Sequence, residues 1–453
     1  MTQSTSDGDD NSGVRPMEVG GRDHRSPPLT RAAILAVVVA ALGYFVDIFD
    51  LLLFALVRDE SLRDLGYDDP VQRRELGVWL DNYLQMTGLM VGGLVWGIIG
   101  DRRGRLSVLF GSILCYSVAN LLNAFVQDVP PNSSFSFLGW IGLDSAIRQY
   151  EVLRFVAGFG LAGELGAGIT LVAELLGRER RGIGTTIVAS VGVLGAVFAA
   201  IITNYMSWRT AYLVGGGLGL ALLFLRVGVV ESGLFHQTKA EHVGRGEFWK
   251  LVSSWDRFKR YAAVVAIGLP IWYAVGVLVK YSADIERSLG IENESVTPVR
   301  QAILWTYVGL AVGDMASGLM SQLIRSRRWT VVVFHVLTAI MVGLQFVLIP
   351  RSPFLSTVLF FLLGVSIGYW AVFVTVAAEQ FGTNLRATAA TTAPNFVRWI
   401  GAAGSAFLWS ALEPVVGTWE AAAIVGALVI LIALLACLSL RESFGTSLDF
   451  VER

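Results

Sequence analysis

The chain has few cysteines and few charged side chains. Of its 453 residues only two are cysteine, and Asp, Glu, Lys and Arg together make up 16%. Cys115 and Cys437 lie in apolar runs far apart in the sequence, which argues against a disulfide framework and against a metal cluster. The net charge of -1, with no basic stripe interleaved with aromatics, argues against a nucleic-acid partner.

Apolar residues, glycine and tryptophan are abundant instead. Hydrophobic residues make up 54% of the chain, which also holds 49 glycines and 13 tryptophans. This is more apolar side chain than a soluble surface could hide, so the chain belongs in a lipid bilayer. No nucleophile, metal cluster or phosphate loop stands in a context that supports it, so we expect neither an enzyme nor a cofactor.

Twelve apolar runs are each long enough to cross about 30 Å of hydrocarbon as a helix. They predict an all-α membrane protein with twelve transmembrane helices in two six-helix, pseudo-symmetric halves. The runs are 32–57, 80–100, 106–125, 152–176, 183–203, 211–230, 261–281, 302–324, 331–348, 354–378, 388–412 and 421–440.

Polar segments divide the chain. Residues 1–28 lack the apolar core of a secretory signal and are expected to be a disordered cytoplasmic tail. Residues 29–230 then form the first half, 231–260 a cytoplasmic linker and 261–440 the second half, before a cytoplasmic tail at 441–453. The long loop after the first run has room for a small amphipathic cap.

Basic residues set the expected orientation. Most Lys and Arg fall on one face if both termini are cytoplasmic, as for a multi-pass protein of the bacterial inner membrane. Only Arg154 and Arg398 are then left within helices. We expect a monomer that binds a small-molecule substrate and protons in the bilayer.

Two motifs recur in both halves. Glu-x-x-Gly-x-x-x-Arg occurs at Glu174 to Arg181 and at Glu379 to Arg386, 205 residues apart. The loop motif that starts at Gly97 has a weaker copy at Gly318, 221 residues on. Two parallel six-helix halves place a substrate site between them near the membrane midplane.

Gly97-Ile-Ile-Gly-Asp101-Arg-Arg-Gly-Arg105 combines glycines for a tight turn, arginines for a cytoplasmic loop and one acid. Its order resembles the loop between helices two and three of major facilitator superfamily transporters. The segments 43–50, 154–164, 207–209, 231–235 and 379–386 resemble the metabolite:proton symporter family and its sugar-porter relatives. The resemblance implies a twelve-helix bundle, alternating access by rocking of the halves, and a proton as the coupling ion.

The chain also departs from that family. Leu89-Met90 stands where the symporters usually have Arg-Pro, and Gln322 follows Ser321 where the second loop motif usually has an acid. Substrate identity therefore does not transfer with the resemblance.

Charged residues inside the membrane are candidates for proton coupling, because such charges need a partner or a water-filled cavity. Asp47 and Asp50 share a face of the first helix, and Arg154 and Glu164 lie on the fourth. We hypothesise that Asp47 or Asp50 pairs with Arg154 in one state and exchanges a proton or substrate in another. The alternative is a permanent ion pair that only fixes helix packing.

A second group of charges is expected to gate the cytoplasmic side. Acid and base from the two motifs would meet there and hold the inner gate shut while the outer cavity is open, Asp101 facing the positive N-terminus of helix eleven. The expected gate residues are Gly97, Asp101, Arg105, Glu174, Arg181, Glu379 and Arg386.

Arg398 is the best candidate for binding an anionic substrate group, because guanidinium pairs with carboxylate in a two-pronged geometry. It could equally pair with Asp314. Lys280 could also contact substrate, whereas His335 is expected to be packed. The expected substrate residues are Asp314, Asn395, Arg398, Trp272, Tyr273, Tyr369 and Trp370.

Gly158-Phe-Gly160-Leu-Ala-Gly163 matches the dinucleotide fingerprint but lies in an apolar helix without the required βαβ unit. We interpret it as close helix packing.

The leading function is proton-coupled uptake of a small polar metabolite such as an organic acid, zwitterion or sugar. The alternatives are a proton-coupled antiporter that exports drugs or metabolites, although segment 189–195 lacks the proline typical of antiporters, and a non-transporting receptor or scaffold.

Overall fold

Long helices make up most of the structure, a computed structural model, and no β-strand occurs among the residues that it describes. These are residues 31–445 except 104, 131, 134–135, 165–167, 169–171, 173–175, 177, 232–247, 293–294, 349–351 and 383–384. Eight helices of this part are long and apolar enough to cross a membrane. The predicted all-α membrane fold is confirmed.

The first predicted half consists mostly of long helices. Its helical elements are α1 (Arg31–Asp64), α2 (Pro70–Gly77), η1 (Val78–Gln85), α3 (Met86–Arg103), α4 (Arg105–Asn123), η2 (Ser136–Ile141), α5 (Ala146–Leu161), α7 (Arg178–Ile202) and α8 (Trp208–Glu231). The short α2 occupies the loop in which the sequence predicts an amphipathic cap. The fourth run is helical to Leu161, and its remainder is only partly described.

The second predicted half repeats this plan. Helix α9 (Phe248–Val252) and the start of α10 lie in the predicted linker 231–260. From there on the helical elements are α10 (Trp255–Tyr273), η3 (Ala274–Val279), α11 (Ser282–Ser288), α12 (Val299–Leu323), α13 (Arg327–Leu348), α14 (Pro353–Ile367), α15 (Trp370–Glu379), α16 (Arg386–Arg398), η6 (Trp399–Gly404), α17 (Ser405–Val416) and α18 (Thr418–Ser439).

Several membrane helices are interrupted where the site will be found. Pro270 and Pro394 lie four or five residues before the π-helical segments η3 and η6. Proline removes one backbone donor and clashes with the preceding turn, which is a common cause of such irregularities. The tenth predicted run breaks at Gly368 and Tyr369 into α14 and α15. Hydropathy predicted continuous helices here because it carries no information on these breaks.

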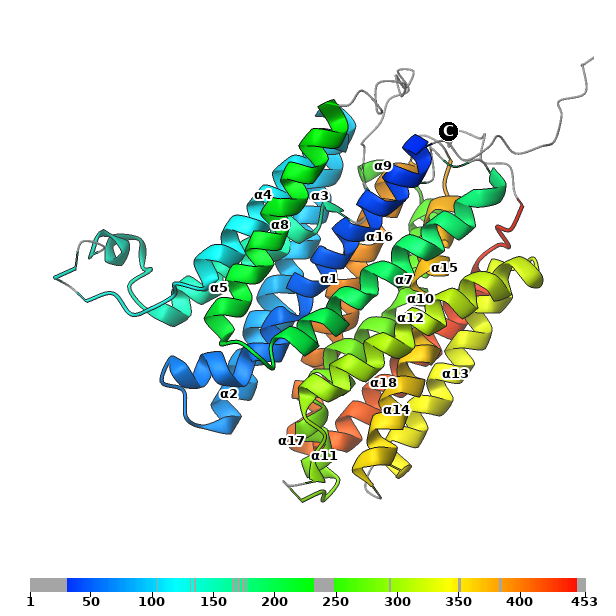
Figure 1. The fold of residues 1–453 in the computed structure, drawn as a ribbon. Coiled ribbons are helices and arrows are strands. Elements are labelled where there is room, and N and C mark those ends of the chain that lie inside the picture. The colour runs from blue at the N-terminus through cyan, green and yellow to red at the C-terminus, as the bar shows by residue number, and fades with distance from the viewer. Residues whose placement is uncertain are drawn as a thin grey trace, which may run out of the picture.

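The helices pack in two groups that meet along one interface (Figure 1). In the first group α1 packs on α7 and α8, and α4 on α5 and α8; in the second, α12 packs on α14 and α10 on α18. Across the interface α7 packs on α12 and α3 on α16. We call the lower end in Figure 1 the α2 end, and the opposite one the α9 end.

Two predicted boundaries differ from the structure. Gly97 lies inside a helix, as the run 80–100 predicts, but α3 continues three residues beyond that run to Arg103. The described end of the predicted polar linker is helical and packed, since Phe248 of α9 stacks on Phe396 at 5.8 Å. The second half begins its first long helix at Trp255, six residues before the predicted start.

Glycines allow close helix contact. A Cβ on Gly158, Gly160 or Gly163 would collide with Gln85, Tyr116 or Ser112 of neighbouring helices, so the fingerprint-like run does serve packing.

The contact between α12 and α14 gives a test of this packing. A Cβ on Gly309 would overlap the backbone carbonyl of Phe361, so Gly309→Ala should lower stability by about 1–3 kcal/mol. Thermal unfolding in detergent measures it. Gly343→Ala is the matched control, because a Cβ there meets nothing within 4 Å and alanine favours helix. Equal unfolding temperatures for the two variants would contradict this account.

Candidate functional site at the interface between the halves

Arg398 lies at the end of α16 between two tryptophan rings. Its side chain is 1% exposed, and its guanidinium lies 5.4 Å from the ring centre of Trp272 of α10 and 5.5 Å from that of Trp370 of α15. The two rings are 6.2 Å apart and nearly perpendicular. The breaks that surround them, η3, η6 and the start of α15, bring these three side chains together.

Hydrogen-bond donors at this cluster have no protein partner. Arg398 bonds through Nη1 to Oδ1 of Asn395 at 3.4 Å, while its Nε and Nη2 have no partner. The indole Nε1 atoms of Trp272 and Trp370 also lack one. Buried donors are almost always satisfied, so this set is suited to an acceptor-rich group such as a carboxylate.

Asn395 connects the cluster to the other half of the molecule. Its Nδ2 donates to the carbonyl of Ala162, just beyond α5, at 3.1 Å, and the side chain packs on Gly93 of α3. One turn along, Trp399 donates to Oγ1 of Thr87 at 3.2 Å. Arg398 therefore lies next to the interface, where a substrate site is expected.

The other predicted substrate residues have separate roles. Asp314 does not form an ion pair with Arg398; its Oδ1 accepts from the backbone N–H of Ala371 at 3.1 Å, at the start of α15. Tyr273 donates to the carbonyl of Ala422 in α18 at 2.6 Å, and Tyr369 to that of Ile267 at 3.0 Å. His335 is buried beside the same carbonyl, as expected of a packed histidine.

Asp47 and Asp50 of α1 are buried acids with few partners. Their exposed fractions are 2% and 0%, and neither oxygen of Asp50 nor Oδ1 of Asp47 has a hydrogen-bond partner. Asp50 packs on Gly215 of α8. Asp47 interacts electrostatically with Glu164, Arg398, Asp50 and Arg226, so it faces charges from both halves.

Glu164 forms an ion pair that the sequence reasoning missed. Its carboxylate is bound by both Nη atoms of Arg226 in α8, one contact at 2.8 Å, and the pair packs against Gly43 of α1. Arg226 is 5% exposed, so the expectation that only Arg154 and Arg398 lie within helices is wrong. Its position inside the apolar run 211–230 was the available signal.

Arg154 of α5 contacts η1 in this structure. Its Nη2 donates to Gln85 and lies 3.7 Å from Oδ1 of Asp81, and its guanidinium lies 4.9 Å from the ring centre of Phe54. Asp81 also binds Nζ of Lys280 at 2.6 Å. Pairing of Arg154 with Asp47 or Asp50 stays a prediction for another state. Asp81 and Gln85 were missed because they lie at the edge of a predicted run.

The α9 end holds part of the predicted gate. Glu379 accepts from Ser443 at 2.8 Å and lies 3.6 Å from Nε of Arg327, while Arg386 donates to the carbonyl of Ala378 at 3.2 Å. Glu174 and the side chains of Asp101, Arg105 and Arg181 lie outside the described residues.

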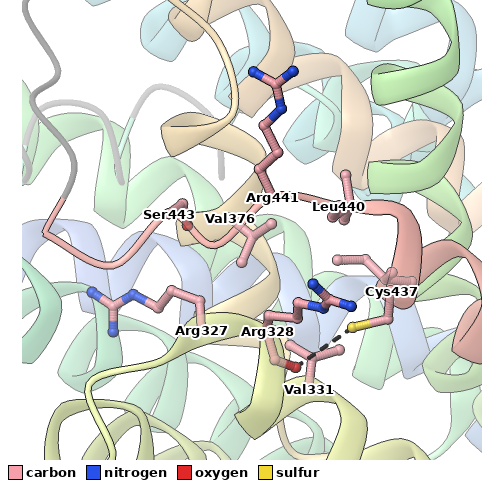
Figure 2. A pocket seen from close by; sticks show the side chains of 9 residues that line it. Arg327, Arg328, Val331, Val376, Cys437, Leu440, Arg441 and Ser443 are labelled. Carbon is pink, nitrogen blue, oxygen red and sulfur yellow. Dashed lines mark hydrogen bonds between the residues drawn. The ribbon is translucent and has the colours of Figure 1, made fainter.

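A small pocket lies near this end, between α13, α15 and α18 (Figure 2). Cys437 donates to the carbonyl of Arg328 there at 3.5 Å, and the side chains of Arg327 and Arg441 point away from it. It has room for about one water molecule, so it is not a substrate site.

Glu442 caps the start of α13 at the same end. Partial burial alone would raise the pKa of Glu442, but hydrogen bonds from Ser326 and from the N–H groups of Phe444, Arg327 and Arg328 outweigh it and lower the pKa. A lowered pKa stabilises the folded state above the ordinary value of about 4.3, and this contribution is lost as pH falls through the lowered pKa.

Glu442→Gln should therefore lower the unfolding temperature at about pH 7, and the difference from the parent should shrink below about pH 4. Thermal unfolding across this range measures it. Glu420→Gln, at the opposite end of α18, is the control. A difference that is independent of pH would exclude the charge of Glu442 as the cause.

Known proteins were compared with this arrangement. Residues 40–406 match the family model of the Major Facilitator Superfamily. A Cupriavidus pinatubonensis protein named "Probable 4-methylmuconolactone transporter" is 25% identical over 80% of this chain and 79% of its own. A Bacillus subtilis protein named "Putative niacin/nicotinamide transporter NiaP" is 24% identical over 83% and 87%.

A solved structure has the same fold. It is the proton:xylose symporter XylE with bound 6-bromo-6-deoxy-D-glucose, which matches with a TM-score of 0.68 and 16% identity over 92% of this chain and 98% of that one. The superfamily resemblance read from the sequence is confirmed. The family match over most of the chain and this shared twelve-helix fold establish that the chain belongs to the major facilitator superfamily and is a membrane transporter of metabolites.

Proposed function

We propose that this transporter imports a small organic acid together with a proton, by alternating access between the two halves. The observation that carries the proposal is the buried Arg398, whose Nε and Nη2 have no partner between Trp272 and Trp370. Four donor nitrogen atoms without a partner favour a carboxylate over an uncharged polar group, and the flanking rings favour a planar or apolar body. The names of the relatives refer to 4-methylmuconolactone and niacin, which are small organic molecules like the proposed substrate.

The surroundings of Asp47 support the proposed proton coupling. This acid interacts electrostatically with Arg398 across the interface. A substrate carboxylate at Arg398 would place a second negative charge close to Asp47, and a proton on Asp47 would remove the repulsion. Proton and anion therefore each strengthen binding of the other, which is the requirement for symport.

Orientation and gating complete the proposal. The distribution of basic residues favours the α9 end as cytoplasmic and the α2 end as the outer face. Glu379, Arg327 and Arg386 would belong to an inner gate that closes when the outer side opens.

A thermal-shift panel tests the substrate class. We expect nicotinate and benzoate to raise the unfolding temperature of the purified protein, and their uncharged amides, nicotinamide and benzamide, to have little effect, because only the acids offer a charge to Arg398. Uptake of the best acid into proteoliposomes, with and without an inward proton gradient, tests coupling. Stabilisation by both amides and neither acid, or uptake insensitive to the gradient, would contradict the proposal.

A further inference from the structure

The α2 end of the interface is closed by a buried charged cluster. Lys280, from the second half, contacts Asp81, from the first, at 2.6 Å, and both side chains are at most 3% exposed. Arg154 lies on the other side of Asp81 at 3.7 Å with 0% exposure. Asp81 thus lies between two buried cations that come from different halves.

The cluster has more donors than the protein satisfies. The carboxylate of Asp81 lies within 4 Å of both cations, Asp50 also interacts electrostatically with Arg154, and Arg58 does so with Lys280. Arg154 Nε and Nη1 and Gln85 Nε2 have no hydrogen-bond partner. Buried cations whose N–H donors lack partners favour binding of a further anion once the halves part and make room for it.

Neighbouring contacts show that this end is shut. Asn82 donates to the carbonyl of Gly276 at 3.0 Å, Arg74 of α2 pairs with Glu413 of α17 at 2.7 Å, and Arg300 donates to Asn204 at 2.6 Å. Each contact joins the two halves. Any movement that opens this end must separate Lys280 from Asp81. Lys280 is then exposed to the opened cavity.

We propose that Lys280 and Arg154 form a carboxylate-binding site at the α2 end, that Asp81 fills it in the closed state, and that the carboxylate of an incoming organic acid takes it when the halves part. This rests on the proposed function for the identity of the incoming acid. The site is separate from Arg398, because Lys280 lies eight residues along the chain from Trp272, or about 12 Å of helix. The site would bind anions at the open α2 end. Asp81 could return to it, and the end could close, only after the anion has left Lys280 and Arg154.

Chemical rescue tests the site without requiring transport. Asp81→Ala removes the internal carboxylate, so the closed state loses its inter-half ion pair and the open-to-closed ratio should rise about tenfold or more. Electron–electron distance measurements between spin labels at Val71→Cys and Glu292→Cys, on the α2 end of the two halves, report this ratio in a Cys115→Ser, Cys437→Ser background. Acetate should then occupy the vacated place and return the ratio towards the parent value, whereas uncharged acetamide should not.

Further variants separate the site from general destabilisation. Lys280→Gln should open the α2 end as Asp81→Ala does, but acetate should leave the ratio unchanged, because one of the two cations is gone. Asp64→Asn, an acid at the same end whose partner Arg209, at 3.3 Å, belongs to the same half, is the matched control and should leave the labels at the parent distance. If Asp81→Ala does not fold, Lys280→Gln alone decides whether the pair closes this end.

Two results would overturn the proposal: parent-like distances in both Asp81→Ala and Lys280→Gln, or rescue by acetate that persists in the double variant without Lys280. In uptake, Lys280→Gln should raise KM for the acid taken up by the parent. Absence of any uptake by the parent would reject the proposed function while leaving the rescue experiment interpretable.

Discussion

Arg398→Gln should weaken binding of the preferred acid by at least about thirtyfold, since loss of one partner from a buried charged contact costs about 2–5 kcal/mol. Arg398 is buried, and its Nε and Nη2 are free to bind a carboxylate. Arg398→Lys keeps the charge but loses the two-pronged geometry, so an intermediate loss is expected. Titration of the purified variants by thermal shift or calorimetry measures the change.

Affinities for the acid and for its amide show whether Arg398→Gln removes a binding contact or only destabilises the fold. If Arg398 binds the carboxylate, the variant loses the preference for the acid but retains its weak affinity for the matching amide. Arg209→Gln is the control, because the partners of Arg209, Asp64 and the carbonyls of Ala124 and Val126, all belong to its own half. Unchanged affinity for the acid in Arg398→Gln, in a protein with a normal size-exclusion profile, would remove Arg398 from the site.

Asp47→Asn and Asp50→Asn should abolish accumulation of substrate against its gradient. Both acids are buried and carry oxygens without partners, which suits them to gain and lose a proton as water reaches them from alternate sides. An amide of the same shape cannot carry that proton. Uptake into proteoliposomes driven by an inward proton gradient should fall to the level of passive equilibration.

Counterflow keeps this test independent of folding. In the variants, exchange of labelled for unlabelled substrate at equal concentrations needs no net proton movement, so it should persist. Asp59→Asn, an exposed acid farther along α1, is the control and should retain full accumulation. Gradient-driven accumulation by both Asp47→Asn and Asp50→Asn would disprove proton coupling through helix one.

The sequence predicted which charged side chains are buried within helices better than it predicted how they pair. Each of these residues interrupts an apolar run, and a charge in the membrane is costly unless it has a partner or a function. They are Asp47, Asp50, Arg154, Glu164 and Arg398. Nothing in the spacing indicated that Arg226 would meet Glu164, or that Asp81 would meet both Arg154 and Lys280. Each of these contacts joins helices that are far apart in the chain.

The sequence by itself determined the class of protein: an all-α membrane bundle of the major facilitator superfamily, with buried charges in known runs. These properties follow from hydropathy, helix length and local motifs, which act along one segment at a time. The tertiary structure decided which charges meet, which donors are left unpaired beside Trp272 and Trp370, and where the interface is closed. Those features depend on how each helix is rotated and where π-helical segments and breaks shift its faces, and only packing between helices fixes that.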